Sequence, residues 1–259
     1  MFIHTETYGS GEPLLLIHGW AMHTGIWRVF AKQLAHYYQV ICVDLPGHGH
    51  SEKIPSFTLE NISLHLEKVL PAASACTLVG WSLGGVVALD LANRFPERVK
   101  SLVMIGSNPC FVKTPTWSGI KQPVLDKFAT DLTADCRGTL LRFLSLQVNG
   151  LQDYKIVFKE LKEALHACEV PESDVLQGGL AILEQQDLRP QLARVACPVQ
   201  AILGGYDTLV PVAVAEQLLD LKPNLNLNVI EKAAHVPFLS HPELLISLLR
   251  DFLETSDGV

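Results

Sequence analysis

The stretch Leu78-Val79-Gly80-Trp81-Ser82-Leu83-Gly84-Gly85 decides how the rest of the sequence is interpreted. An apolar run leads into it, and a helical pattern follows at once from Val86 to Phe95. A G-x-S-x-G motif between a strand and a helix is typical of a nucleophile elbow, in which a sharp turn exposes the serine hydroxyl at the edge of a sheet. The flanking glycines leave room for the neighbouring strand and helix. Ser82 is therefore the predicted nucleophile.

Composition indicates a well-cored globular protein. Of the 259 residues, 48% are hydrophobic and 18% are charged, and the net charge is −7. An acidic chain lacks the basic footprint of a general nucleic-acid or anionic-membrane binder. The N-terminal segment has no signal-peptide pattern, and no apolar run reaches the ~18 residues of a membrane span. We expect a cytoplasmic protein.

The cysteines lie singly in the sequence, without C-x-x-C pairs or histidines at metal-ligand spacing. We expect reduced thiols, no disulfide framework, no metal and no cofactor. The six residues are Cys42, Cys76, Cys110, Cys136, Cys168 and Cys197.

Apolar runs alternate with helical patterns along much of the chain, which predicts an α/β fold with a mainly parallel sheet and helices on both faces. Phe2 to Tyr8 alternates in the manner of a strand. Buried strands are predicted at Leu14–Ile17, Val40–Asp44, Cys76–Val79, Val99–Ile105, Val199–Leu203 and Leu225–Ile230, and helices at Trp27–Leu34, Leu59–Leu70, Val212–Leu221 and Pro242–Leu253. Thr58 is a predicted N-cap.

Residues 110–186 interrupt this alternation. They contain no strand-like run, and helical patterns cover Gln122–Asp131, Ala134–Val148, Leu151–Ala167 and Asp174–Glu184. A helical insertion late in such a sheet is typical of a lid over the active site. We therefore predict a core of residues 1–109 and 187–259 with a helical lid, residues 110–186.

A serine hydroxyl needs a general base, and the base needs a carboxylate that fixes its tautomer. In folds with this elbow the order along the chain is serine, acid, histidine. Only His235 and His241 follow the last predicted strand, and His235 lies in the loop directly after it. His241 stands at the start of the closing helix, where a capping role is more natural. His235 is the predicted base.

Asp207 is the predicted carboxylate. It follows the Val199–Leu203 strand, at the edge of the sheet where open α/β folds bind ligands. Asp220 falls within a predicted helix and Asp187 lies before the strand, so both are interpreted as structural.

The oxyanion of an acyl transfer needs two preorganised donors. The elbow itself supplies the Leu83 N–H, and the loop after the Leu14–Ile17 strand supplies the Trp20 N–H. The Trp20 indole either forms a wall of the acyl pocket or belongs to the core. His18 is expected to brace the loop.

With these residues assembled, the chain resembles the α/β-hydrolase superfamily and, within it, the pimeloyl-[acyl-carrier protein] methyl ester esterases of biotin synthesis. The matching stretches are His18-Gly19-Trp20, Asp44-Leu45-Pro46-Gly47, Gly80-Trp81-Ser82-Leu83-Gly84-Gly85, Asn108-Pro109-Cys110-Phe111, Arg142-Phe143-Leu144-Ser145-Leu146-Gln147, Asp174-Val175-Leu176-Gln177-Gly178-Gly179-Leu180 and Ala233-Ala234-His235-Val236-Pro237-Phe238. The lid stretches discriminate best, because lids vary most between activities.

The resemblance implies a serine carboxylesterase that hydrolyses the methyl ester of a pimeloyl chain on acyl carrier protein through an acyl-enzyme. It implies substrate contacts at Trp20, Ser82, Leu83, Phe143, Leu144, Ser145, Leu146, Gln147 and His235. Ser145 departs from the alanine expected of the family. Without the resemblance, Phe143, Leu144 and Leu146 would be interpreted as the buried face of a lid helix.

Basic side chains recur along one face of the predicted lid, at Lys155, Lys159 and Lys162, with Arg142 on the preceding helix. This face is a candidate docking surface for an acidic carrier protein, although Glu160 and Glu163 interleave and a merely solvated face remains the alternative. We expect a monomer whose partner is the carrier.

Two other functions remain open. The same triad serves broad small-ester, lactone and carbon–carbon bond hydrolases, which the sheet alone does not distinguish. A non-catalytic ligand receptor on this scaffold is disfavoured by the ordered set Ser82, Asp207 and His235.

Overall fold

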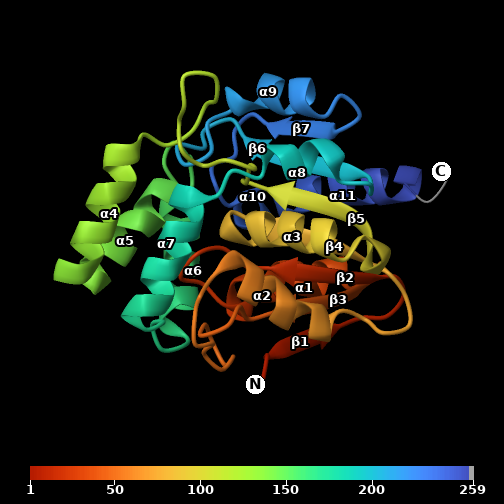
Figure 1. Cartoon of the computed structure of the whole chain (residues 1–259), viewed down its shortest axis with the longest axis horizontal. Coiled ribbons are helices and arrows are strands. Elements are labelled where there is room, and N and C mark those ends of the chain that lie inside the picture. The colour runs from red at the N-terminus through yellow and green to blue at the C-terminus, as the bar shows by residue number, and fades with distance from the viewer. Residues whose placement is uncertain (257–259) are drawn as a thin grey trace.

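A seven-stranded sheet forms the centre of the molecule (Figure 1). The computed structural model describes residues 1–256. The strands are β1 (Thr5–Tyr8), β2 (Pro13–Ile17), β3 (Gln39–Val43), β4 (Cys76–Trp81), β5 (Val99–Ile105), β6 (Val199–Gly204) and β7 (Asn226–Ile230). Their order across the sheet is β1-β3-β2-β4-β5-β6-β7, and only β1 runs antiparallel to its neighbour. The predicted mainly parallel sheet is confirmed.

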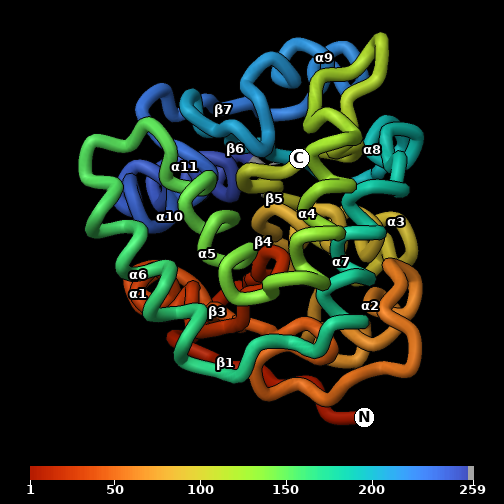
Figure 2. Tube along the Cα trace, turned by 90° about the vertical axis from the view of Figure 1, so that its left-hand side faces the viewer, coloured from red at the N-terminus to blue at the C-terminus, as the bar shows by residue number. Residues whose placement is uncertain are grey.

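Helices cover both faces of the sheet, as Figures 1 and 2 show together. On one face lie α2 (Leu59–Leu66), α3 (Leu83–Arg94) and α8 (Arg189–Arg194), and on the other lie α1 (Arg28–Leu34) and α11 (Pro242–Ser256). Strands β2 and β4 are buried along their whole length, as expected for strands covered on both faces. The remaining elements of the core are α9 (Val214–Leu221), α10 (Pro237–Ser240) and the 3₁₀ turns η1 (Thr24–Trp27), η2 (Glu67–Val69) and η3 (Pro96–Arg98).

Four consecutive helices form an insertion between β5 and α8, the short helix that precedes β6. They are α4 (Gln122–Ala134), α5 (Cys136–Gln147), α6 (Tyr154–His166) and α7 (Ser173–Gln185). In Figure 1 they lie to the left, where the arrow of β5 points, and in Figure 2 they stand in front of the sheet. The helical insertion therefore covers the carboxyl ends of the strands.

The structure differs from the sequence prediction mainly at element ends. The predicted helix 59–70 is α-helical only to Leu66 and then tightens into η2, while its predicted cap is confirmed, because the Thr58 hydroxyl accepts a hydrogen bond from Asn61 N–H. The short helices α8 and α10 escape prediction because one or two turns carry too little periodicity to detect. Within residues 1–256 no helix is both long and apolar enough to cross a membrane.

Candidate active site

Ser82 occupies the turn between β4 and α3 with a strained backbone. Its φ of 55° and ψ of −119° lie outside the regions that L-residues favour. The turn is held by hydrogen bonds: the Ser82 carbonyl accepts from Gly85 N–H at 2.9 Å and from the Ser107 hydroxyl at 2.8 Å. A Cβ on Gly84 would lie 2.2 Å from the Ile17 carbonyl oxygen, so only glycine permits this close packing of α3 on β2.

His235 and Asp207 meet at the same edge of the sheet from two different loops. His235 Nδ1 lies 2.7 Å from Asp207 Oδ2, and both side chains are fully buried. The second carboxylate oxygen of Asp207 accepts hydrogen bonds from Leu209 N–H at 2.8 Å and Val210 N–H at 2.9 Å. These bonds fix the carboxylate, which in turn orients the imidazole. Among the described residues His235 Nε2 has no hydrogen-bond partner, so this nitrogen is available to a reacting group.

The loop after β2 packs directly on the serine turn. A Cβ on Gly19 would lie 3.2 Å from Ser82 Cβ, so the backbone that leads into Trp20 runs beside the serine. Leu83 is the first residue of α3, whose N-terminus points at this region. His18 braces the loop as expected: it lies 2.8 Å from the Gly19 carbonyl through Nδ1 and accepts from Leu45 N–H at 2.9 Å through Nε2.

The Trp20 indole joins the sheet to the helical insertion. Its N–H donates to the Leu176 carbonyl in α7 at 2.9 Å, and its ring meets Phe143 of α5 edge-on at 5.0 Å between centroids. The Trp20 side chain is buried and belongs to the packed interior. It also contacts Phe143, which lines a cavity at Ser82.

A cavity beside the serine turn is lined in part by Ser82. Every other residue that lines it is apolar, which suits a hydrocarbon chain better than a polar ligand. The lining residues besides Ser82 are Phe111, Ile120, Val124, Leu125, Phe128, Phe143, Leu180, Leu183 and Leu209. Of this set, only Phe143 is among the substrate contacts that the resemblance implies. The spacing of Val124, Leu125 and Phe128 marks the apolar face of a helix, but such a stripe does not reveal that it faces a cavity.

The segment 143–147 is divided among different surroundings. Phe143 lines the cavity, Leu144 and Gln147 are buried, and Leu146 is half-buried. Ser145 is exposed, and its hydroxyl donates to the Arg142 carbonyl at 2.7 Å. The Gln147 amide has no hydrogen-bond partner among the described residues.

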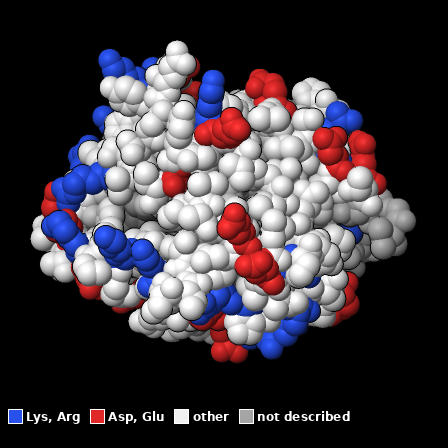
Figure 3. Space-filling view, turned by 90° about the horizontal axis from the view of Figure 1, so that it is seen from above, with Lys and Arg blue, Asp and Glu red and all other residues white. Residues whose placement is uncertain are grey.

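The candidate docking residues are exposed on the outside of the insertion, and Lys and Arg gather on that side of the molecule in Figure 3. Lys155 and Lys162 stand on α6 beside Lys159, which forms a 3.7 Å ion pair with Glu163. Arg142 on α5 lies 3.7 Å from Asp131 and 3.8 Å from Asp135. The lysine side chains of α6 are therefore paired with fewer acidic side chains than Arg142 is.

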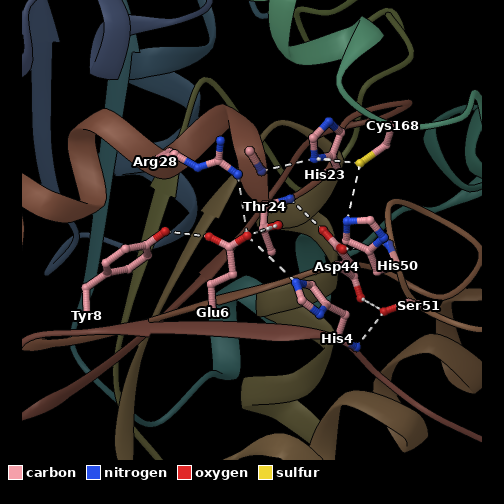
Figure 4. A network of polar contacts seen from close by, with 11 residues as sticks. His4, Glu6, Tyr8, His23, Thr24, Arg28, Asp44, His50, Ser51 and Cys168 are labelled. Atoms are coloured by element: carbon pink, nitrogen blue, oxygen red, sulfur yellow. Dashed lines mark hydrogen bonds and ion pairs between the residues drawn. The ribbon is translucent and has the colours of Figure 1, made fainter.

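A polar cluster ties the insertion to the β1 side of the core (Figure 4). His23 Nε2 lies 2.7 Å from the Ala164 carbonyl of α6, and Cys168 Sγ lies 3.6 Å from His23 Nδ1 and 3.8 Å from His50 Nε2. Asp44 accepts from Thr24 N–H and His50 N–H. In residues 1–256 no group of His, Cys, Asp and Glu side chains could hold a metal ion. We therefore interpret these contacts as structural, because they join the insertion to the core.

Comparisons with known proteins agree with this architecture. The family model described as the alpha/beta hydrolase fold matches residues 12–242. Solved structures with the same fold include an esterase from Exiguobacterium antarcticum (TM-score 0.87, 22% identity, 97% of this chain and 95% of that chain) and a bromoperoxidase from Bacillus anthracis (TM-score 0.88, 21% identity, 97% and 95%). At such identities the likeness establishes the fold alone.

Sequence relatives are more informative. A pimeloyl-[acyl-carrier protein] methyl ester esterase from Aliivibrio fischeri is 38% identical over 97% of both chains. A protein of the same name from Methylococcus capsulatus is 38% identical over 99% of this chain and 100% of its own length. The matched length includes the helical insertion as well as the sheet. This chain belongs to the α/β-hydrolase fold family and, within it, to the pimeloyl-[acyl-carrier protein] methyl ester esterases.

Proposed function

We propose that this chain is a serine carboxylesterase that hydrolyses the methyl ester of a pimeloyl chain attached to acyl carrier protein. The observation that carries the proposal is the hydrogen-bonded pair His235 and Asp207 at the sheet edge that also bears the strained Ser82, beside an apolar cavity. The substrate class comes from the relatives, which carry this activity in their names.

All three members of the triad take part in each half-reaction. His235 Nε2 takes the proton of the Ser82 hydroxyl as Oγ attacks the ester carbonyl. The tetrahedral intermediate collapses, the C–O bond to the methoxy group breaks, and His235 returns the proton so that methanol leaves. A water then attacks the acyl-enzyme with His235 again as base, which frees the carboxylate and restores Ser82. Asp207 stabilises the imidazolium that forms in both halves.

The backbone N–H groups of Trp20 and Leu83 are the proposed donors to the oxyanion, because the loop after β2 packs beside Ser82 and Leu83 opens α3. Loss of one such donor typically costs ~3–4 kcal/mol of barrier. The acyl chain is proposed to lie along the apolar cavity, and Phe143 to contact it directly. Leu144, Ser145, Leu146 and Gln147 complete the proposed substrate-binding segment.

The division of the chain into a core, residues 1–109 and 187–259, and a lid, residues 110–186, is part of the proposal. It is supported by the position of α4–α7 over the carboxyl ends of the strands. The partner is proposed to be an acyl carrier protein that docks on the basic face at Arg142, Lys155, Lys159 and Lys162, and the enzyme to act as a cytoplasmic monomer without a cofactor.

The alternative is a broad small-ester, lactone or carbon–carbon bond hydrolase that uses the same triad. Turnover of a methyl pimelate half-ester on carrier protein, compared with the same half-ester on free pantetheine, separates the two. We expect kcat/KM to be at least ~10-fold higher on the carrier, because docking adds binding energy remote from the reacting bond. Equal values on both, or preference for a short lactone, would favour the alternative. Ser82→Ala is the background control.

A further inference from the structure

Trp81 joins the strand that carries the nucleophile to the loop that carries the base. It is the last residue of β4, and its indole N–H donates to the backbone carbonyl of His235 at 2.8 Å. The two residues are 154 positions apart in the sequence. The indole is 1% exposed, and its ring lies 5.7 Å from the imidazole of His235 between centroids.

The other side of His235 is held as well. Its backbone N–H donates to the Gln147 carbonyl, at the end of α5, at 3.1 Å. The backbone N–H and C=O of His235 thus both have partners outside their own loop. The N–H bonds to the insertion and the C=O bonds to the last residue of β4. Because the side chain can only be as well placed as its backbone, these two bonds restrain the approach of Nε2 to Ser82.

We infer that Trp81 is a positioning residue for the general base, and that its N–H, not only its bulk, holds His235 in line between Asp207 and Ser82. The inference rests on the proposed function, since it assigns a role in that reaction. Trp81 is absent from the cavity lining, so it lies outside the proposed path of the acyl chain. Its ring packs beside the His235 imidazole and its N–H donates to the His235 backbone. It acts through the His235 backbone.

A second tryptophan in the same aromatic cluster provides the comparison. Trp27 is fully buried, lies 6.3 Å from Trp81 and 4.3 Å from Phe238 between ring centroids, and within residues 1–256 its indole N–H has no hydrogen-bond partner. Trp81 also packs on Phe238, at 5.1 Å. The two side chains therefore share burial and aromatic packing, and they differ in the hydrogen bond to His235.

The experiment compares Trp81→Phe with Trp27→Phe in the full-length enzyme, at a temperature where both variants are folded. Both substitutions shrink a buried ring, and both are expected to lower Tm. In Trp81→Phe we expect kcat to fall ~10- to 100-fold with KM within ~2-fold, because a base displaced by a fraction of an ångström affects the reaction step rather than binding. In Trp27→Phe kcat should stay within ~2-fold.

A second substitution covers the case in which Trp81→Phe does not fold. Replacement of Trp81 by 3-benzothienylalanine keeps the bicyclic shape and exchanges the N–H for sulfur, so the same loss of kcat is expected with little change in Tm. Equal kcat losses in the Trp81 and Trp27 variants, or an unchanged kcat in the benzothienyl enzyme, would overturn the inference. Failure of the proposed function would look different, because the wild-type enzyme itself would then neither turn over the ester nor react with a fluorophosphonate at Ser82.

Discussion

His235 Nδ1 and Asp207 Oδ2 lie 2.7 Å apart in a fully buried contact between the loops that follow β7 and β6. An ionised carboxylate can only accept, so the imidazole proton belongs on Nδ1 and the lone pair on Nε2. The relationship therefore selects the tautomer that a general base for Ser82 requires.

Replacement of Asp207 by asparagine should leave the enzyme folded and nearly inactive. The side-chain amide can donate to Nδ1, which would place the imidazole proton on Nε2, the wrong nitrogen for accepting the Ser82 proton. We expect kcat to fall by roughly 10⁴. Steady-state hydrolysis of a methyl ester measures this kcat. Asp187→Asn is the matched control, because Asp187 pairs with Arg189 away from the triad. A kcat within about tenfold of wild type would contradict the assigned role.

Gly106 borders the same contact. Its φ is +49°, and a Cβ there would lie 3.2 Å from His235 Nδ1 and 3.4 Å from Asp207 Oδ2. Gly106→Ala should therefore lower kcat by about tenfold or more, because the added methyl group displaces the pair, and should also lower stability by ~1–2 kcal/mol through backbone strain. Kinetics and urea unfolding of the same preparation separate the two effects.

Gly11→Ala is the control for strain alone. Gly11 also has a positive φ, +108°, but its nearest neighbour to a new Cβ is the Tyr37 carbonyl oxygen at 3.8 Å, far from the triad in sequence and structure. It should lose stability and keep kcat. If both variants lost kcat in proportion to their loss of stability, Gly106 would have no specific link to the base.

Charge reversal on α6 tests carrier docking. The double variant Lys155→Glu with Lys159→Glu should lower kcat/KM for carrier-bound ester ~10-fold at low ionic strength, and the deficit should shrink as salt screens the charges. Activity on a free methyl ester should not change. Lys32→Glu with Lys68→Glu alters net charge equally at exposed positions on the core. If both double variants lose kcat/KM on carrier-bound ester equally, the carrier docks on a surface other than α6.

Two buried histidines predict loss of stability in acid. Burial lowers the pKa of His18 and the pKa of His48 to about 3, from an ordinary value of 6.5. Between those values the unfolded chain binds protons that the folded chain does not, so the free energy of unfolding decreases as the pH falls. Each residue contributes a slope of ~1.4 kcal/mol per pH unit well below pH 6.5. The physical reason is visible at His18, whose Nε2 accepts from Leu45 N–H and cannot do so once protonated.

His48→Gln isolates one of these groups. Whatever its effect on stability at neutral pH, it should reduce the slope of the unfolding free energy against pH by ~1.4 kcal/mol per unit between about pH 6 and pH 4. Urea unfolding at several pH values measures the slope. The wild-type enzyme, unfolded in the same buffers, provides the reference slope. An unaltered slope in His48→Gln would mean that His48 is already protonated in the folded protein.

The sequence predicts the sheet and the approximate place of Ser82, Asp207 and His235 because these features are local. An elbow motif between a strand and a helix is a contiguous pattern, and residues directly after parallel strands must meet at one edge of the sheet. The buried contact between Asp207 and His235 agrees with that reasoning. Their catalytic roles stay predictions until activity is measured.

Contacts made through the helical insertion could not be predicted in the same way. The cavity wall draws on Val124 and Phe128 of α4 and on Leu183 of α7, and periodicity alone does not say which surface an apolar stripe covers. The bonds from His235 to Trp81 and to the Gln147 carbonyl join segments far apart in the chain, and no local pattern encodes them. Such pairings follow from tertiary packing, which needs the whole fold.

Covalent labelling of the intact enzyme with a fluorophosphonate tests the central claim most directly. The serine oxygen displaces fluoride, and peptide mass spectrometry then locates the new phosphorus–oxygen bond. The account predicts a single adduct on Ser82, formed at a rate that falls at least ~10³-fold in His235→Ala, because the base is needed to activate the hydroxyl. An adduct on another residue, or equally fast labelling of Ser82 without His235, would contradict it.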